Sequence, residues 1–329
     1  GVSVVSGRLG EIIGKVYVEK HFDQKAKNRM LELVENLREA YRISIEELDW
    51  MGDSTKVQAQ EKLKKFRPKV GFPNEWKDYS NLVISKDDLV GNIKNSTLDR
   101  TIKNREKLGK PIDREEWGMT PQTVNAYYSP LLNEIVFPAG ILQPPFFNME
   151  ADDAVNYGAI GAVIGHEMGH GFDDKGSKYD GNGELRNWWT ESDRKQFEER
   201  TKKLIDQYNG YTVVDGTPVN GEFTQGENIG DLAGIVIAYK AYQLSKKGSK
   251  APIIDGLTGD QRFFFGWATI WGSKSTDEQL IRQIKTDPHS PGEFRANGPL
   301  VSMPEFVNLY NVKPGDGMYI DPNDRVKIW

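Results

Sequence analysis

The sequence predicts an α+β fold that is mainly α-helical and contains one small β-sheet. Long segments of the 329-residue chain repeat apolar residues at intervals of three and four, the spacing of an amphipathic helix. One short region, 122–137, instead has the aromatic and β-branched content of two strands around a turn. The chain contains no cysteine, so neither a disulfide framework nor a thiolate metal site is possible.

The first part of the chain is predicted to be a helical scaffold that extends to residue 66. Residues 22–49 are rich in Leu, Glu, Arg and Ala at near-helical spacing, and 54–66 is a second helical run that ends before Pro68. Residues 67–120 are charged and interrupted by Pro, Gly and Asn, and they predict irregular structure.

The rest of the chain is predicted to form a second domain. Its strands, 124–128 and 135–137, are joined by a polar turn and closed by Pro138, as in a β-hairpin. We therefore divide the chain into a helical segment, 1–74, and a larger domain, 75–329. The further helices are expected at 154–172, 190–208, 226–245, 259–271 and 277–284.

The composition excludes several classes of function. A net charge of −5 argues against nucleic acid as the main partner. No apolar stretch approaches the roughly 18 residues needed to cross a bilayer, so no transmembrane segment is predicted. The start of the chain, Gly1-Val2-Ser3, lacks the basic and apolar regions of a signal peptide, so any such segment would lie outside this sequence.

Two of the four histidines, His166 and His170, form an H-E-x-x-H sequence with Glu167. Residues four apart lie on the same face of a helix, so both imidazoles can bind one metal ion. Glu167 lies beside them, where its carboxylate can accept a proton from water activated by that metal. This residue pattern is typical of a zinc hydrolase.

A third ligand is needed, because catalytic zinc usually takes three protein ligands and leaves one position for water. The best candidate is Glu227, and Asp231 follows it one helical turn later. A second carboxylate there can accept the free ring N–H of a ligand histidine and fix its orientation. We therefore predict Glu227 as the third ligand and Asp231 as its neighbour that orients a histidine.

Small residues are predicted to bring the two helices together. Glycine recurs along the first helix at intervals of three, four and four residues, although each costs about 1 kcal/mol relative to Ala in a helix interior. Small residues also follow Glu227 along the second helix. We expect close packing of the two helices, which lets Glu227 reach the histidines. The residues concerned are Gly158, Gly161, Gly165 and Gly169, and Gly230, Gly234, Ala238 and Ala241.

The loop Thr286–Arg295 contains a further histidine, His289, and an arginine, Arg295. Amide hydrolysis builds negative charge on the carbonyl oxygen, and a His or Arg donor directed at that oxygen lowers the barrier. The residues alone leave a second interpretation open, namely a surface loop with an ordinary histidine.

Five sequence motifs together resemble the neprilysin family of zinc metallopeptidases, which includes the endothelin-converting enzymes and bacterial oligopeptidases. They occur in matching order, and the resemblance runs from about residue 10 to the C-terminus. The resemblance implies a thermolysin-like zincin catalytic domain in 75–329 that binds one Zn²⁺ per chain. The motifs are VNAYY with IVFPAGILQPPFF, HEMGHGFDDKG, ENIGDLAG, KTDPHSPGEFR and the closing Lys327-Ile328-Trp329.

The resemblance implies a role for each matching residue. His166, His170 and Glu227 would bind zinc, Glu167 would be the general base, and Asp231 would orient a ligand histidine. The remaining residues would act on the substrate. His289 would stabilise the oxyanion, and Arg295 would hold the carbonyl after the scissile bond. Asn125 and Ala126 would bond the peptide backbone as an added strand, and an apolar pocket would be lined by Ile141, Phe146, Val163 and Trp271.

These roles together imply a metalloendopeptidase that hydrolyses oligopeptides on the amino side of hydrophobic residues. Family members are about twice as long as this chain, so segment 1–74 is interpreted as the tail of a capping helical lobe. The upstream half of the same protein would then be a partner. The cysteine-free chain is more similar to the bacterial members, and we expect an extracytoplasmic location in a bacterium.

Two alternatives remain open from the sequence. A zinc aminopeptidase would need an acidic residue beside the edge strand to hold the substrate's free amine, and residues 124–127 offer none. A non-catalytic peptide-binding fragment that lacks its capping lobe is the other alternative.

Overall fold

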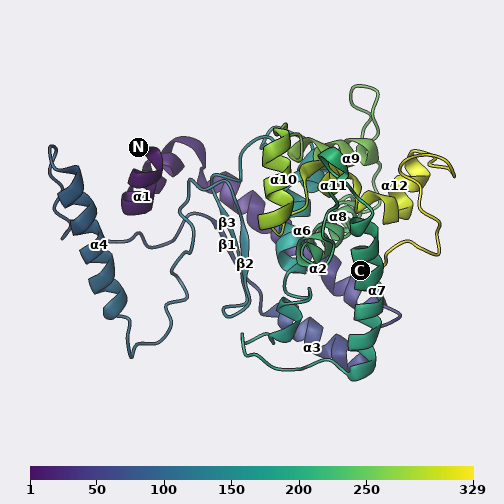
Figure 1. The fold of residues 1–329 in the computed structure, drawn as a ribbon, viewed down its shortest axis with the longest axis horizontal. Coiled ribbons are helices and arrows are strands. Elements are labelled where there is room, and N and C mark those ends of the chain that lie inside the picture. The colour runs from purple at the N-terminus through teal and green to yellow at the C-terminus, as the bar shows by residue number, and fades with distance from the viewer.

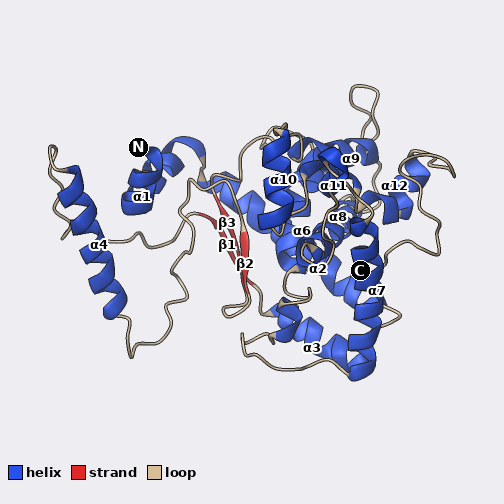
Figure 2. Cartoon of the chain, viewed as in Figure 1, coloured by secondary structure: helices blue, strands red, loops and turns tan.

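The structure is a computed structural model that describes residues 1–329, and it is mainly helical with one small sheet (Figure 2). This confirms the predicted fold class. The helices are α1 (Val2–His21), α2 (Gln24–Glu47), α3 (Asp53–Lys64), α4 (Leu89–Arg105), α5 (Asp153–Asn156), α6 (Ala162–Gly169), α7 (Glu191–Asn209), α8 (Gln225–Ser245), α9 (Gly259–Ile270), α10 (Asp277–Thr286), α11 (Gly292–Asn297) and α12 (Pro304–Leu309).

The sheet has three strands in the order β1-β3-β2. The predicted hairpin is present as β2 (Tyr127–Ser129) and β3 (Glu134–Pro138), which pair antiparallel, with Asn133 in the turn at a φ of 49°. Strand β1 (Arg67–Gly71) pairs in parallel with β3, so β2 has a free edge.

The prediction of irregular structure over 67–120 is wrong at both β1 and α4. Strand β1 has Pro68 and Lys69 within five residues, which is unusual for a strand. It is stabilised by the parallel pairing and by a buried ion pair in which Lys69 Nζ lies 2.8 Å from the Glu134 carboxylate of β3. This partner is 65 positions away in the sequence, so the local pattern does not reveal it.

The sequence does not predict helix α4, because this helix has no buried apolar face. Among its residues only Ser96 is buried, whereas Leu89, Val90, Leu98 and Ile102 are exposed. The helix begins at Asp88, whose carboxylate caps it by accepting from Gly91 N. Figure 1 shows α4 and α1 at one side of the molecule, away from the main helical body.

The predicted helix over 154–172 is interrupted by a change of helix type. It runs from α5 through a π-helical segment, Tyr157–Gly161, into α6, and His170 follows as its C-cap. Segments of this kind recur near functional sites. Helices α2, α8 and α9 surround it, and the Tyr41 hydroxyl of α2 donates to Gly165 O at 2.7 Å.

Helices α6 and α8 pack at the close distance that the small residues predict. A Cβ added at Gly234 would lie 2.4 Å from Ala162 O, and one at Gly165 would lie 2.9 Å from the Gly234 backbone. The glycines of the first helix do not all serve this contact, however. A Cβ at Gly158 would meet Phe263 O of α9, and one at Gly161 would meet only ordinary contacts at 3.5 Å.

We expect Gly234→Ala to destabilise the protein by about 1–3 kcal/mol, because the new methyl group overlaps backbone atoms of α6 and forces the helices apart. Gly161→Ala is the matched control, and we expect it to be neutral or stabilising by up to about 1 kcal/mol, since its methyl group meets no close atom. Urea unfolding of both variants measures the difference. Equal effects would contradict the close contact between α6 and α8.

Candidate active site

The three predicted metal ligands converge on one point. His166 lies on α6, His170 is the residue that ends it, and Glu227 lies in the first turn of α8. One potential ligand atom from each residue falls within a group whose members are at most 4.8 Å apart. Glu227 Oε2 is 3.2 Å from His166 Nε2 and 3.7 Å from His170 Nε2.

These distances fit a tetrahedral zinc ion. Metal–ligand bonds of about 2.0–2.1 Å in tetrahedral geometry place ligand atoms about 3.4 Å apart. Glu227 Oε2 is also buried with no hydrogen bond of good geometry, which is costly for a carboxylate oxygen unless another group compensates it. Two imidazole nitrogens and one carboxylate oxygen form a usual donor set for catalytic zinc.

The charge balance of the site points to the same conclusion. Burial alone would raise the pKa of the Glu227 carboxyl, but the surrounding imidazoles lower it well below its usual value. Burial would likewise lower the pKa of His170, whereas Asp173 and Glu227 raise it well above its usual value. The carboxylates thus favour positive charge at this point, and a divalent cation would supply it.

Each histidine of the candidate metal site is oriented by a carboxylate. His166 Nδ1 lies 2.8 Å from Asp231 Oδ1, and His170 Nδ1 lies 2.7 Å from Asp173 Oδ2. With Nδ1–H donated to the carboxylate, Nε2 of each ring is left as a lone pair that faces Glu227. Asp173 was not predicted, although its spacing three residues after His170 was a usable signal.

Asp231 also binds Arg295, which contacts it with two nitrogens. Arg295 Nε and Nη2 lie 2.7 Å and 2.6 Å from the two carboxylate oxygens, and the guanidinium stands 4.0 Å over the Trp271 ring. Burial would raise the pKa of Asp231, but Arg295 lowers it, so the carboxylate stays ionised. One buried side chain therefore connects His166 and Arg295.

We expect Asp231→Asn to weaken zinc binding by about 10- to 100-fold, because the amide no longer accepts strongly from both His166 and Arg295. Competition with a chromogenic chelator measures the affinity. Asp206→Asn is the control, since this exposed carboxylate pairs only with Lys202 on α7. Unchanged zinc affinity in Asp231→Asn would show that its hydrogen bond to His166 is irrelevant to the metal.

Two further predicted residues, Glu167 and His289, adjoin this candidate site: Glu167 follows His166 in α6, and His289 contacts Glu227. Glu167 is 7% exposed, and burial raises the pKa of its carboxyl, which makes it a better proton acceptor near neutral pH. His289 Nε2 lies 3.1 Å from Glu227 Oε2, and its Nδ1 lies 2.6 Å from Asp287 Oδ1. The sequence left two interpretations of the His289 loop, and the geometry favours the one in which His289 belongs to the site rather than to an ordinary surface loop.

The remaining predicted substrate-binding residues lie either directly before strand β2 or against the hydrophobic core. Asn125 is exposed and Ala126 is buried, and they directly precede the free-edged strand β2. The four apolar residues pack against the hydrophobic core, Ile141 as a buried residue and Phe146, Val163 and Trp271 as half-buried ones. Their role in binding a substrate side chain stays a prediction.

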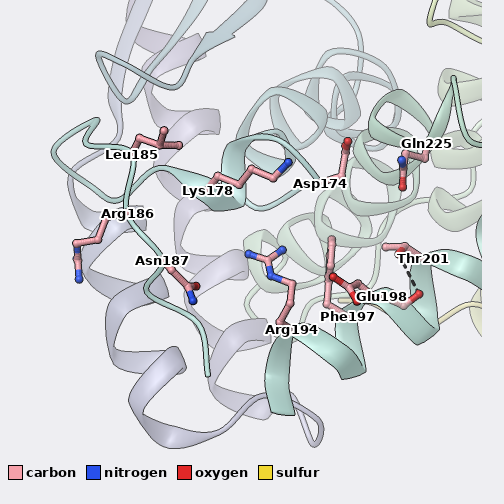
Figure 3. Close-up of a pocket in the computed structure, with 10 residues that line it drawn as sticks. All are labelled: Asp174, Lys178, Leu185, Arg186, Asn187, Arg194, Phe197, Glu198, Thr201 and Gln225. Carbon is pink, nitrogen blue, oxygen red and sulfur yellow. Dashed lines mark hydrogen bonds between the residues drawn. The ribbon is translucent and has the colours of Figure 1, made fainter. Parts of the chain in front are cut away.

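Two hollows lie near the candidate metal ligands, and one of them is lined by two of the three, His170 and Glu227. A hollow of about 210 Å³ opens onto His170 and Glu227 and is also lined by Tyr128, Phe223 and Pro288. A second hollow, of about 610 Å³, is lined by residues of the segment 174–187, by α7 and by Gln225 (Figure 3). Lys178 and Arg194 point into it, but it contains no metal ligand, so we assign the chemistry to the smaller hollow.

Comparison with known proteins identifies the family. The model of peptidase family M13 matches residues 125–326, and the model of the N-terminal part of the same family matches residues 1–73. The chain belongs to peptidase family M13. It is 37% identical to neprilysin-3 of Drosophila melanogaster and 38% identical to endothelin-converting enzyme 1 of Mus musculus, and each match covers 100% of this chain.

The same relation appears among solved structures. The zinc metalloprotease Zmp1 of Mycobacterium tuberculosis, solved with an inhibitor, is 55% identical with a TM-score of 0.95 over 100% of this chain and 50% of its own. PepO from Lactobacillus rhamnosis is 34% identical with a TM-score of 0.87, over 98% of this chain and 50% of its own. The resemblance to a family of zinc metallopeptidases is thus confirmed.

This M13 chain spans less than half the length of the curated relatives, 43% of neprilysin-3 and 44% of endothelin-converting enzyme 1. It nevertheless contains both histidines and the glutamate of the candidate metal site. No helix is long and apolar enough to serve as a membrane span.

Proposed function

We propose that this chain is the zinc-binding half of an M13 metalloendopeptidase that hydrolyses oligopeptides on the amino side of hydrophobic residues. The observation that carries the proposal is the convergence of His166, His170 and Glu227 at distances suited to one zinc ion. Family membership supports the assignment of zinc in particular.

The residues around the ligands have complementary parts in peptide hydrolysis. Bound zinc would act as a Lewis acid that activates water and polarises the scissile carbonyl. Glu167 would accept the proton of the attacking water and deliver it to the leaving amine. His289 would donate a hydrogen bond to the carbonyl oxygen as negative charge builds on it.

Peptide binding would use the free edge of β2 and the residues beside it. Asn125 and Ala126 would bond the substrate backbone, which is the usual way in which an extended peptide adds to a sheet edge. Arg295 would bond the carbonyl that follows the cut through the nitrogen that Asp231 does not engage. Ile141, Phe146, Val163 and Trp271 would receive the hydrophobic side chain.

We also propose that 1–74 is the end of a capping lobe and 75–329 the catalytic domain. The exposed apolar residues of α1 and α4, among them Val2, Leu89 and Leu98, would then contact the upstream half of the protein. The similar structures from bacteria support a bacterial origin, and an extracytoplasmic location stays a prediction.

Cleavage of internally quenched peptides tests this proposal directly. We expect turnover that a chelator removes and one equivalent of zinc restores, with product masses that place the cut before a hydrophobic residue. A peptide with a blocked N-terminus should be cleaved equally well, whereas an aminopeptidase would leave it intact. Zinc and peptide binding without any cleavage would favour the non-catalytic fragment, and failure to bind zinc would overturn the proposed zinc peptidase.

A further inference from the structure

We infer that Ser290 is a positioning residue for His289, because its hydrogen bond to Asn228 holds the His289 loop against α8, the helix that carries Glu227. This inference rests on the function proposed above. His289 lies in the loop between α10 and α11, and its side chain is 43% exposed. Its Nε2 nevertheless lies 3.1 Å from Glu227 Oε2. A partly exposed histidine needs firm support if it is to meet an oxyanion at one fixed place.

The support is a chain of buried hydrogen bonds. Ser290 Oγ donates to Asn228 Oδ1 at 2.8 Å, and Asn228 Nδ2 donates to Thr224 Oγ1 at 2.9 Å. Thr224 Oγ1 in turn donates to Asn220 O at 3.0 Å. The Ser290, Asn228 and Thr224 side chains belong to residues that are each 1% exposed, so water does not compete for these bonds.

The hydrogen bond between Ser290 and Asn228 matters because of where these two residues lie in the sequence. Ser290 directly follows His289, and Asn228 directly follows Glu227. A single buried bond between them therefore sets how far the histidine stands from the metal ligand. The support from α10 is weaker, since Gln283 Nε2 reaches the carbonyls of His289 and Ser290 only at 3.3 Å and 3.5 Å.

The remaining contact of the histidine lies within its own loop. Asp287 Oδ1 accepts from both the backbone N and the ring Nδ1 of His289, so it sets the tautomer and the rotation of the ring. It does not connect the loop to α8. Asp287 thus orients the imidazole, whereas the Ser290–Asn228 bond fixes the position of the loop relative to the zinc ligands.

A double-mutant cycle tests this role in the zinc-loaded chain. We expect Ser290→Ala to lower kcat about tenfold with little change in KM or zinc affinity, because the misplaced donor acts only on the transition state. In a His289→Leu background the same change should alter kcat less than twofold. The inference would be overturned if Ser290→Ala lowered kcat just as much in the His289→Leu background, or if Ser290→Ala alone did not lower kcat. Ser290→Cys, with a weaker donor of similar shape, should lie between Ser290→Ala and the wild type.

A second readout does not depend on turnover. The chain has four histidines, so their ring ¹H–¹⁵N signals can be resolved and assigned. In the metal-free chain, Ser290→Ala should shift or broaden the His289 signals and leave those of His21 unchanged. Ser302→Ala is the matched control, because it removes another buried serine hydrogen bond, from Val326 N at 3.0 Å. Unmoved His289 signals would overturn the inference, whereas an inactive wild type would count against the proposed function alone.

Discussion

Glu167→Gln should bind zinc as tightly as the wild type and cleave peptides roughly 10²–10⁴-fold more slowly, the usual contribution of a general base. The amide has the same size as the carboxylate, so it leaves His166 and His170 in place. It cannot accept a proton from water, however, and burial raises the pKa of the carboxyl that it replaces, which is the property that suits Glu167 to this task. Steady-state kinetics and metal analysis on the same sample measure the two effects.

The comparison needs a glutamate that is remote from the site. Glu199→Gln on α7 removes an exposed carboxylate with only a long contact, of 4.0 Å, to Lys195, and it should leave kcat/KM unchanged. If Glu167→Gln retained more than about a tenth of the wild-type kcat, another group would have to serve as the base.

Glu227→Gln should reduce zinc affinity by more than about 100-fold, beyond the 10- to 100-fold typical when an outer partner of a ligand is lost. The wild-type site offers zinc two histidines and one negatively charged carboxylate, whereas the variant offers the two histidines and a neutral amide. Peptide cleavage should fall with the metal content, and added zinc should restore part of it. Zinc titration monitored by chelator competition provides the measurement.

Thermal unfolding supplies an independent check on the same variant. Zinc that binds only the folded protein raises the wild-type Tm in proportion to the logarithm of its concentration. We expect this shift to shrink in Glu227→Gln, while the Tm of the metal-free proteins differs little. An unchanged zinc-dependent shift would mean that the carboxylate is not a ligand.

Much of the metal site could be predicted because its parts are local in the sequence. His166 and His170 are one helical turn apart, as are Glu227 and Asp231, and the period of the helix alone places each pair on one face. The glycines then indicated which helices meet. The Gly165 and Gly234 contact confirmed that argument, although Gly158 turned out to contact α9.

The missed features depend on partners that are distant in the sequence or on weak local patterns. Strand β1 is stabilised by pairing with β3 and by the Lys69–Glu134 ion pair, neither of which its own residues reveal. Helix α4 lacks a buried stripe, so its apolar residues have no helical periodicity to detect. The Ser290–Asn228 bond joins residues 62 positions apart, and only the folded chain brings them together.

The central claim is that His166, His170 and Glu227 hold one zinc ion, and a crystal structure of the zinc-loaded chain tests it most directly. Anomalous scattering measured at the zinc edge should give one strong peak within about 2.0–2.2 Å of both Nε2 atoms and a Glu227 oxygen. A peak elsewhere, or no peak with Glu227 turned away from the histidines, would contradict the account.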